Sequence, residues 1–302
     1  MKWFGKAAVR GLVAACGLAL QGLAMGAPVS VLDDDGQRIT LPAPAQRIVS
    51  LAPHTTELLF DAGAGAKVVA TVRYGDYPEA AKKLPQVGDA HSLDLEQIAA
   101  LKPDLIVVWM HGNSARQIER LHALKLPIFH SEPRSLPAIA DGMRRLGLLA
   151  GTEPAANAAA DAFMADLGAL RQRYSGRPPV KVFYQIWSKP LMTVNKGHLI
   201  SDVISLCGGV NVFADQPLLV PTPSVEAVLA TQPEVLATGT PDGKPDDSLQ
   251  PWQGLKAFAP VAKNQIIWLT SDEISRHTPR ILLGARQMCE GLDAVRAKRS
   301  GT

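Results

Sequence analysis

Two widely separated stretches of the sequence place a carboxylate at the same point of the same pattern. In residues 92–109, SLDLEQIAALKPDLIVVW, Glu96 is followed seven residues later by Pro, then by an acidic residue and a short apolar run. Residues 222–239, TPSVEAVLATQPEVLATG, repeat this arrangement with Glu226. Packing of a helix against a sheet requires the apolar positions, but it does not require Glu at equivalent places. Packing alone therefore does not explain why Glu is repeated, and a shared function is one explanation. The alternative is that both glutamates simply lie on a solvated helix face.

Other residues that could do chemistry give weaker patterns. His91 and His111 each follow an expected strand end, where cleft residues of a parallel sheet lie, so either could approach a bound metal. No H-x-x-H or Cys/His pair accompanies them, which favours ordinary loop histidines over a zinc site and leaves a contact with a ligand's metal open. No G-x-S-x-G elbow, Walker loop or G-x-G-x-x-G after a strand is present, so the sequence gives little support for an enzyme.

From residue 47 onward, short apolar runs alternate with helical patterns. The first half predicts strands at 47–51, 67–72, 104–109 and 127–130, and helices at 55–63, 93–101, 114–124 and 135–150. The second half predicts strands at 180–187, 234–239 and 264–271, and helices at 199–209, 224–232 and 278–298. Strand and helix taken in turn predict an α/β fold with parallel sheets covered by helices. Ahead of them, residues 29–41 predict a small hairpin that turns at Asp35-Gly36.

A single long helix is expected between the two halves. Thr152 can cap it, and Gly176 followed by two prolines ends it. About 22 residues at 1.5 Å each give a length of roughly 33 Å. We therefore expect an N-terminal lobe over residues 27–152, a connecting helix over 153–176 and a C-terminal lobe over 177–302. Clefts between lobes are common ligand sites.

The first 26 residues predict a secretory signal peptide. Three basic residues precede the apolar run 11–20, and small residues at 24 and 26 suit cleavage after Gly26. The run is too short for a membrane-spanning helix. Lipid attachment at Cys16 is the remaining alternative, although the residues after it stay apolar. We therefore expect the mature chain to be exported.

Charge and cysteine content narrow the function classes further. The signal peptide holds three of the 31 Lys and Arg residues and none of the 28 Asp and Glu residues, so the mature chain is close to neutral. This balance offers no electrostatic case for nucleic-acid binding. Cys207 and Cys289 remain after cleavage, and an even pair in an exported chain predicts a disulfide; two buried free thiols are the alternative.

Four stretches together resemble a known family. They are RIVSLAPHTTELLFDAGAGAKVVATVRYGDYPEAAKKLPQVGD, LDLEQIAALKPDLIVVW, SLCGGVNVF and LTSDEISRHTPRILLGARQMCEGL, in this order between Arg47 and Leu292. They resemble the class III, or helical-backbone, periplasmic substrate-binding proteins, and most closely the cobalamin receptors of vitamin import. The resemblance implies two Rossmann-like lobes joined by one rigid helix, and a cleft that holds a metal chelate. It also implies delivery to the permease dimer of an inner-membrane ABC importer, with no prosthetic group and a monomeric receptor.

The resemblance also assigns roles to particular residues. Glu96 and Glu226 match the two rim carboxylates that dock against arginines of the permease subunits, which answers the question raised by the repeat. Tyr74 and Trp109 match aromatic cleft positions that lie against the corrin, and half-buried core aromatics are the alternative. The segment matching the loop that reaches the corrin amides consists of Asp272, Glu273, Ile274, Ser275 and Arg276.

Departures from the family pattern leave the macrocycle open. Ala90 stands where those receptors show a further Trp, and Glu273 and Ile274 stand where aromatics are usual, while Trp187 partly compensates. The expected ligand is cobalamin. The alternatives are heme or a ferric siderophore, for which Tyr74 or Tyr77 would serve as a phenolate ligand or stacking partner, and an exported two-lobed enzyme.

Overall fold

The computed structural model describes Met1 and residues 27–300. The predicted signal peptide, with Cys16, lies outside the described residues apart from Met1. Within residues 27–300 no helix combines the length and the apolar character that a membrane span requires.

The N-terminal lobe is built on a parallel four-stranded sheet in the order β4-β3-β5-β6. Its strands are β3 (Ile48–Ser50), β4 (Val68–Ala70), β5 (Leu105–Trp109) and β6 (Ile128–Ser131). Its helices are α1 (Pro53–Asp61), η1 (Gly65–Lys67), η2 (Glu79–Lys83), α2 (Leu95–Ala100), α3 (Ala115–Ala123) and α4 (Leu136–Ala150). The central strands are apolar and buried along most of their length because helices cover both faces of the sheet.

The C-terminal lobe repeats this plan with a parallel sheet in the order β10-β7-β11-β12. Its strands are β7 (Val180–Gln185), β10 (Gly209–Asn211), β11 (Val235–Thr240) and β12 (Ile266–Thr270), with a small hairpin of β8 (Trp187–Ser188) and β9 (Leu191–Met192). Its helices are α6 (Leu199–Leu206), α7 (Val225–Thr231), η3 (Asp247–Leu249), α8 (Gln250–Gln253), α9 (Ala259–Ala262), α10 (Ser271–Ser275) and α11 (Ile281–Ser300). The predicted parallel sheets are confirmed, but the sequence patterns gave no sign of β10 or of the β8-β9 hairpin.

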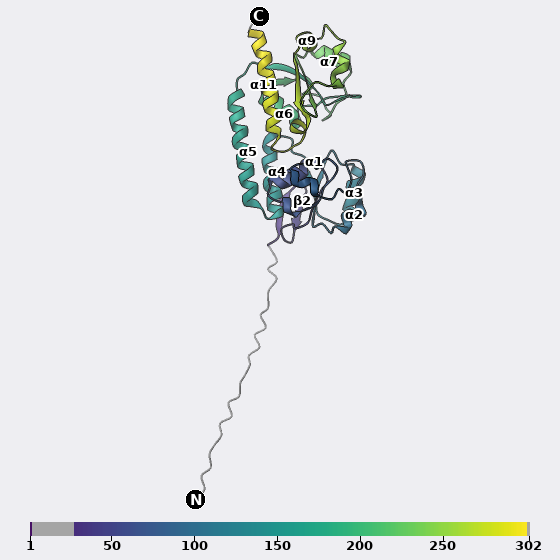
Figure 1. Ribbon diagram of the computed structural model, residues 1–302, viewed down its shortest axis with the longest axis vertical. Helices are drawn as coiled ribbons and strands as arrows, with labels where there is room; N and C mark the ends of the chain where they lie inside the picture. Colours follow the sequence, from purple (N-terminus) through teal and green to yellow (C-terminus); the bar gives the residue numbers. More distant parts are fainter. Residues whose placement is uncertain (2–26, 301–302) are drawn as a thin grey trace.

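Helix α5 (Glu153–Tyr174) joins the lobes and runs along one side of both (Figure 1). Its buried stripe of Ala156, Ala160, Phe163, Leu167, Leu170 and Tyr174 follows the helical period. This stripe belongs to one hydrophobic core that also contains residues of α1, α4, α6 and α11. The predicted long helix is therefore confirmed. Because a single core crosses from lobe to lobe on this side, the cleft has to open on the other.

The predicted hairpin forms from β1 (Val29–Leu32) and β2 (Arg38–Leu41), but its turn is longer than expected. Asp33 Oδ1 accepts the backbone N–H groups of Asp35 and Gln37, which closes a five-residue loop instead of a two-residue turn. The loop also binds the edge strand β6. The N–H of Asp34 donates to the carbonyl of His130, and His130 Nδ1 lies 2.8 Å from Asp33 Oδ2. The hairpin thus covers an otherwise open sheet edge.

A disulfide joins Cys207, at the end of α6, to Cys289 in α11, with their Cα atoms 4.7 Å apart. This confirms the predicted pairing and removes the alternative of two free thiols. The bond ties the C-terminal helix to the lobe that it covers.

Candidate ligand-binding cleft

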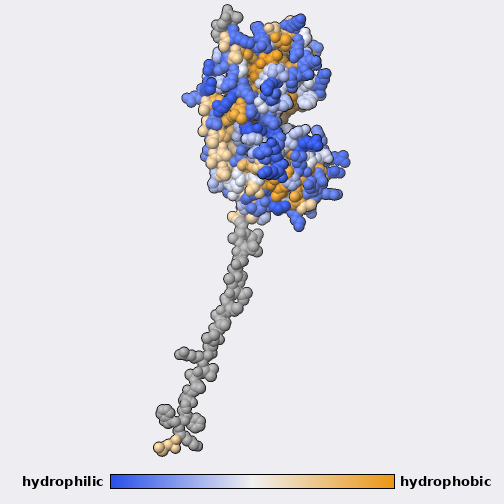
Figure 2. Space-filling view, viewed as in Figure 1, coloured by the Kyte–Doolittle hydropathy of each residue, from blue (hydrophilic) through white to orange (hydrophobic). Residues whose placement is uncertain are grey.

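A recess separates the two lobes on the side of the molecule away from α5 (Figure 2). A pocket of about 360 Å³ in the N-terminal lobe adjoins it, lined by Leu51, Ala52, Pro53, Val72, Arg73, Tyr74, Asp89, Ala90, His91, Trp109 and Asn113. A pocket of about 810 Å³ in the C-terminal lobe is lined by Tyr184, Gln185, Ile186, Trp187, Ser188, Thr238, Gly239, Pro241, Asp246, Asp247, Ser248, Ser271 and Ser275. Both pockets lie at the carboxyl ends of parallel strands, where ligands of α/β folds bind.

Between the pockets, charged side chains join the lobes. Glu57 of α1, only 1% exposed, accepts hydrogen bonds from Arg276 at 2.6 Å and from Arg280 at 2.8 and 3.0 Å. Arg276 also pairs with Asp76 at 3.1 Å and with Asp272 at 2.8 Å. We call Glu57, Asp76, Arg276 and Arg280 the ion cluster. It connects the N-terminal lobe to the segment between α10 and α11.

Beside the ion cluster, aromatic rings meet at the same boundary. The ring of His54 lies 5.3 Å from that of Trp109 and 5.5 Å from that of His277, and His277 lies 5.9 Å from His198. We call His54, His198 and His277 the histidine cluster. His54 Nε2, His277 Nδ1 and Trp109 Nε1 are buried and have no hydrogen-bond partner within the described part of the chain.

Burial keeps the imidazoles of the cluster uncharged. It lowers the pKa of His54 to about 3, with a further contribution from the charge of Arg276. Burial also lowers the pKa of His198 to about 4 and that of His277 well below its usual range, the latter helped by the other two histidines. At neutral pH the boundary between the lobes is therefore a neutral aromatic contact next to a paired ionic one.

Exposed aromatic side chains stand in each pocket. Tyr74 is 65% exposed and has a φ of 66°, a left-handed conformation that is uncommon for a non-glycine residue. Trp187 is 61% exposed, and its indole N–H donates to the carbonyl of Lys189 at 3.0 Å. Tyr77, in contrast, lies against the guanidinium of Arg280 at 3.9 Å from its ring centre. Among the described residues that line the two pockets, Tyr74 and Trp187 are therefore the most exposed aromatic side chains.

Trp109 does not lie open in the same way. It ends β5, lines the N-terminal pocket and is half-buried, because its ring packs against the histidine cluster. Its backbone N–H is held by the side chain of Asn113 at 2.7 Å. Trp109 thus lines the pocket and also packs at the boundary between the lobes, and its contact with the ligand stays a prediction.

The predicted amide-contacting segment divides into different environments. Ser275 lines the C-terminal pocket and Asp272 is exposed, whereas Arg276 is committed to the ion cluster. Ile274 is fully buried under Gly239, and Glu273 accepts a hydrogen bond from Gln287 of α11. Ile274 and Glu273 therefore face the protein, because α10 packs one side against β11 and α11. This burial does not fit the ligand-contacting role expected for Ile274.

The two candidate loop histidines are also separated. His91 is exposed in the N-terminal pocket, where the carboxylate of Asp89 accepts its backbone N–H at 2.9 Å. His111 lies outside the residues that line this pocket, with its ring 3.2 Å from Glu132. Within residues 27–300 no group of three or more His, Cys, Asp or Glu side chains is arranged to hold a metal ion.

The repeated glutamates occupy matching places. Glu96 is the second residue of α2 and Glu226 the second residue of α7, and both are exposed. The carboxylate of Glu226 accepts hydrogen bonds from its own backbone N–H and from the side chain of Ser224. These two bonds, the first more than the second, lower the pKa of Glu226. Helices α2 and α7 lie one on each lobe, on the side away from α5 (Figure 1).

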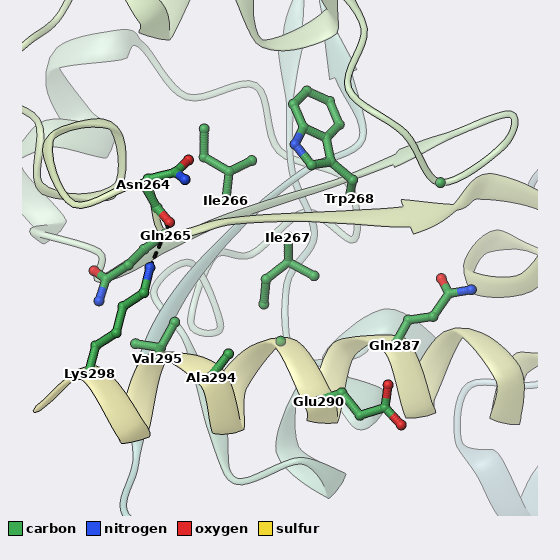
Figure 3. Close-up of a pocket in the computed structure, with 12 residues that line it drawn as sticks. Asn264, Gln265, Ile266, Ile267, Trp268, Gln287, Glu290, Ala294, Val295 and Lys298 are labelled. Atoms are coloured by element: carbon green, nitrogen blue, oxygen red, sulfur yellow. Dashed lines mark hydrogen bonds between the residues drawn. The ribbon is translucent and has the colours of Figure 1, made fainter. Parts of the chain in front are cut away.

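Another hollow is less suited to a ligand. It lies between the edge strand β12 and α11, has a volume of about 450 Å³ and belongs to one lobe (Figure 3). Side chains of α11 already bind the strand at both ends: Gln287 accepts the N–H of Thr270, and Lys298 donates to the carbonyl of Asn264. The cleft is the better candidate because it combines two lobes with open aromatic faces.

Several residues of the cleft were not found from the sequence. Glu57 is 219 positions away from Arg276, the one member of this pair that the sequence predicted, and His54 directly precedes an apolar helical pattern that predicted only packing. Ser248 lines the C-terminal pocket from the short helix η3, in a stretch without a motif. The only sequence signal for His54 and Glu57 was their place shortly after the strand expected at 47–51.

Comparisons with known proteins fit this architecture. The profile of the family described as periplasmic binding protein matches residues 48–273. The vitamin B12-binding protein of Vibrio cholerae serotype O1 is 39% identical over 248 residues, which cover 82% of this chain and 89% of that protein. The crystal structure of periplasmic vitamin B12-binding protein BtuF of Vibrio cholerae superposes with a TM-score of 0.76 at 38% identity, covering 84% of this chain and 98% of that one. The apo periplasmic heme-binding protein RhuT of Roseiflexus shares the fold, with a TM-score of 0.68 at 24% identity over 83% and 99% of the two chains.

Proposed function

Because the chain belongs to the periplasmic binding protein family, we propose that it captures a corrinoid, cobalamin, in the cleft between its lobes and delivers it to an ABC importer. The observation that carries the proposal is the pair of open aromatic faces, Tyr74 in one lobe and Trp187 in the other. Two rings on opposite lobes suit a large flat macrocycle. Each ring can cover part of the macrocycle and loses little side-chain entropy in doing so. The likeness to vitamin B12-binding proteins selects the corrin among such macrocycles.

The polar lining of the cleft suits the amide side chains of a corrin. The C-terminal pocket is lined by several residues with polar side chains, Ser248 among them. Ser271 and Ser275 line the same pocket and add hydroxyl groups that can donate or accept. We include Tyr74, Trp109, Trp187, Asp272 and Ser275 in the proposed contact set. Arg276 contributes by holding the two lobes together beside the ligand.

In this proposal the protein is a monomeric receptor that acts in the periplasm after cleavage of residues 1–26 and catalyses no reaction. Its binding partners are the corrinoid and the permease dimer. The ion cluster and the histidine cluster hold the two lobes in contact beside the cleft. Such a receptor has only to enclose the ligand and release it.

Equilibrium titration of the purified protein with cyanocobalamin, cobinamide, hemin and a ferric siderophore tests the ligand. We expect cyanocobalamin to bind more tightly than hemin or the siderophore, and cobinamide to show whether the lower nucleotide contributes. Preferential binding of hemin would replace the corrinoid proposal with a heme receptor. Chemical conversion of any of these compounds would refute a purely binding role.

We further propose that Glu96 and Glu226 dock the two lobes onto the two permease subunits. Both carboxylates are exposed, one on each lobe, and their helices α2 and α7 lie on the side of the molecule away from α5. A twofold transporter that receives a receptor with two similar lobes can use the same contact twice. Arginine partners would give such rim pairs their effect on registration and encounter rate.

Reversing both charges, Glu96→Arg with Glu226→Arg, tests this docking. We expect transport into cells or proteoliposomes to be lost while cobalamin affinity in solution is unchanged, because like charges that face each other cost several kcal/mol at an interface. Reversal of Glu96 alone should leave a complex that weakens strongly with salt. Glu79→Arg, at another exposed carboxylate of the N-terminal lobe, serves as a control for reversal of a surface charge. Normal import by the double reversal would leave the repeat as a trace of duplicated lobes.

A further inference from the structure

The contact between the lobes contains imidazoles that have no place for an additional proton. His54 and His277 are each 4% exposed and come from different lobes. A protonated imidazole has two N–H donors, yet His54 Nε2 and His277 Nδ1 meet no acceptor among the described residues. Protonation of either ring would therefore bury an uncompensated charge while the lobes remain in contact.

His198 resists protonation for a separate reason. Its Nδ1 accepts the backbone N–H of Ile200 at 3.1 Å and so caps the N-terminus of α6. A proton on this nitrogen would remove the acceptor and place a positive charge at the positive end of the helix. His198 also contacts the ring of His277, so a charge on either one disfavours a charge on the other.

We propose that the histidine cluster makes closure of the lobes sensitive to protons, so that mild acid shifts the ligand-free receptor toward an open arrangement. Opening would expose His54 and His277 to water, where imidazole accepts a proton near neutral pH. The device acts on the lobes themselves, and it does not depend on which ligand the cleft binds. It would couple ligand exchange to the pH of the compartment.

Charged groups around the cluster act in both directions. The elements packed around the cluster carry the carboxylates of Glu57 and Asp61 on α1, Asp76 after β4, Asp272 and Glu273 on α10, and Asp202 on α6, and the cations Arg276 and Arg280. Arg276 lies close enough to lower the pKa of His54 further, after the larger effect of burial. Glu57 is already paired with both arginines, so it is not free to stabilise an imidazolium.

Asp61 opposes the histidines. Burial and the neighbouring Glu57 raise its pKa to about 6, so acid favours the arrangement in which it is buried. Its folded pKa lies above the usual value of 3.8, and the stability that it contributes is therefore present at low pH and lost as pH rises through about 6. For the histidines the sign is reversed. Their pKa values are lowered in the closed state, so the histidines favour closure above pH 6.5. Their contribution to closure is lost progressively as the pH falls below 6.5.

The expected size follows from the same linkage. A histidine with a pKa of about 3 when closed and 6.5 when open favours opening by about 30-fold at pH 5 relative to neutral pH. His277 and His198 also favour opening in acid. Asp61 favours closure in acid, and it lowers the ratio of open to closed molecules roughly tenfold if opening exposes it fully. We therefore expect the ratio of open to closed molecules to rise at least about tenfold between pH 7.5 and pH 5.

Distances between spin labels in the ligand-free protein test the proposal. Labels on Glu119→Cys of α3 and Lys256→Cys, both exposed and on different lobes, report the separation of the lobes. We expect a population with a changed distance to grow between pH 7.5 and pH 5 in the otherwise unaltered protein. The double variant His54→Asn with His277→Gln, which retains His198 and Asp61, should show a much smaller growth of this population in acid, while His122→Ala, an exposed histidine of α3, should behave like the parent.

Circular dichroism at both pH values separates lobe opening from unfolding. If the double variant does not fold, His277→Gln alone removes the ring that contacts His54, Trp109 and His198, and it should reduce the pH response severalfold. A parent distribution that does not change between pH 7.5 and pH 5 would overturn the proposal. An equal response in parent and histidine variants would also overturn it and would assign the effect to carboxylates. Neither outcome affects the ligand titration, so the proposed function stands or falls separately.

Discussion

Replacement of Tyr74 or Trp187 by Ala should weaken corrinoid binding without weakening the fold. An aromatic side chain has about 150–250 Å² of surface to bury, and these two are 65% and 61% exposed, so each offers on the order of 100–150 Å² to a ligand. At about 25 cal/mol per Å², complete coverage would contribute roughly 2.5–4 kcal/mol. A planar ligand covers mainly one face of a ring, which leaves about 1–3 kcal/mol, or roughly a 5- to 150-fold increase in Kd.

The assay is tryptophan-independent, such as equilibrium dialysis of cyanocobalamin, with thermal unfolding of each variant measured in parallel. Because both side chains are already exposed, their removal should change the free energy of unfolding by less than about 0.5 kcal/mol. Leu283→Ala is the matched control, since Leu283 is 46% exposed and lies on α11 beside α5, away from the recess. The Leu283→Ala variant should bind cyanocobalamin with the same affinity as the parent protein.

Unchanged affinity in both aromatic variants would refute the placement of the macrocycle between the two rings. Trp109→Ala provides a contrast, because this ring packs against the histidine cluster. We expect it to lower both the affinity and the melting temperature. A loss of stability with unchanged affinity would make Trp109 a packing residue alone.

Two further outcomes concern the contacts that hold the structure together. Glu57→Ala should destabilise the protein by about 3–5 kcal/mol in denaturant unfolding, because it leaves Arg276 and Arg280 without their buried partner, whereas Glu79→Ala, which breaks an exposed pair with Lys82, should cost at most about 1 kcal/mol. Equal effects of the two would show that the ion cluster does not stabilise the closed lobes. Replacing Cys207 and Cys289 by Ala should cost about 2–4 kcal/mol, since the bond closes a loop with a sequence separation of 82. A reducing agent should lower the stability of the parent to that of this variant and leave the variant itself unchanged.

The repeating strands and helices were predictable because their residues carry a local signal. The run Leu105–Trp109 is apolar throughout and is buried on both faces, which is typical of a central parallel strand. The stripe of α5 follows the helical period, and Gly176 lies just past its end. The short strand β10 escaped prediction because Gly209–Asn211 has too few residues to show a period.

The contacts between the lobes could not be predicted in this way. His54 follows Pro53 at the start of a helix whose apolar residues account for its pattern, and nothing local distinguishes a buried boundary from a buried core. Its partner His277 lies more than 200 residues later, in a loop. The hairpin shows a related limit. Its strands were predicted from alternation, but its pairing with β6 depends on Asp33 and Asp34 meeting a strand that the fold brings close.

Within the repeat, the structure accounts for each shared feature apart from the first carboxylate. Lys102 and Gln232 both adopt positive φ, at 48° and 49°, and end their helices just before the prolines. The acidic residue after each proline binds the start of the neighbouring strand: Asp104 accepts the N–H groups of Gln46 and Arg47, and Glu234 accepts the N–H of Lys181. These residues are needed for the fold of each unit.

Glu96 and Glu226 have a weaker structural explanation, which limits what their reversal can cost. A carboxylate in the first turn of a helix gains about 0.3–1 kcal/mol from the helix dipole, so Arg at both positions should destabilise the protein by a few kcal/mol at most. Such a variant should remain folded and should bind its ligand. Glu96→Gln with Glu226→Gln removes the charges without adding repulsion, and it should transport at a reduced rate that depends less on salt. If both double variants lost stability in proportion to transport, helix capping would explain the repeat, whereas loss of transport alone requires a partner that meets the two lobes at the same point.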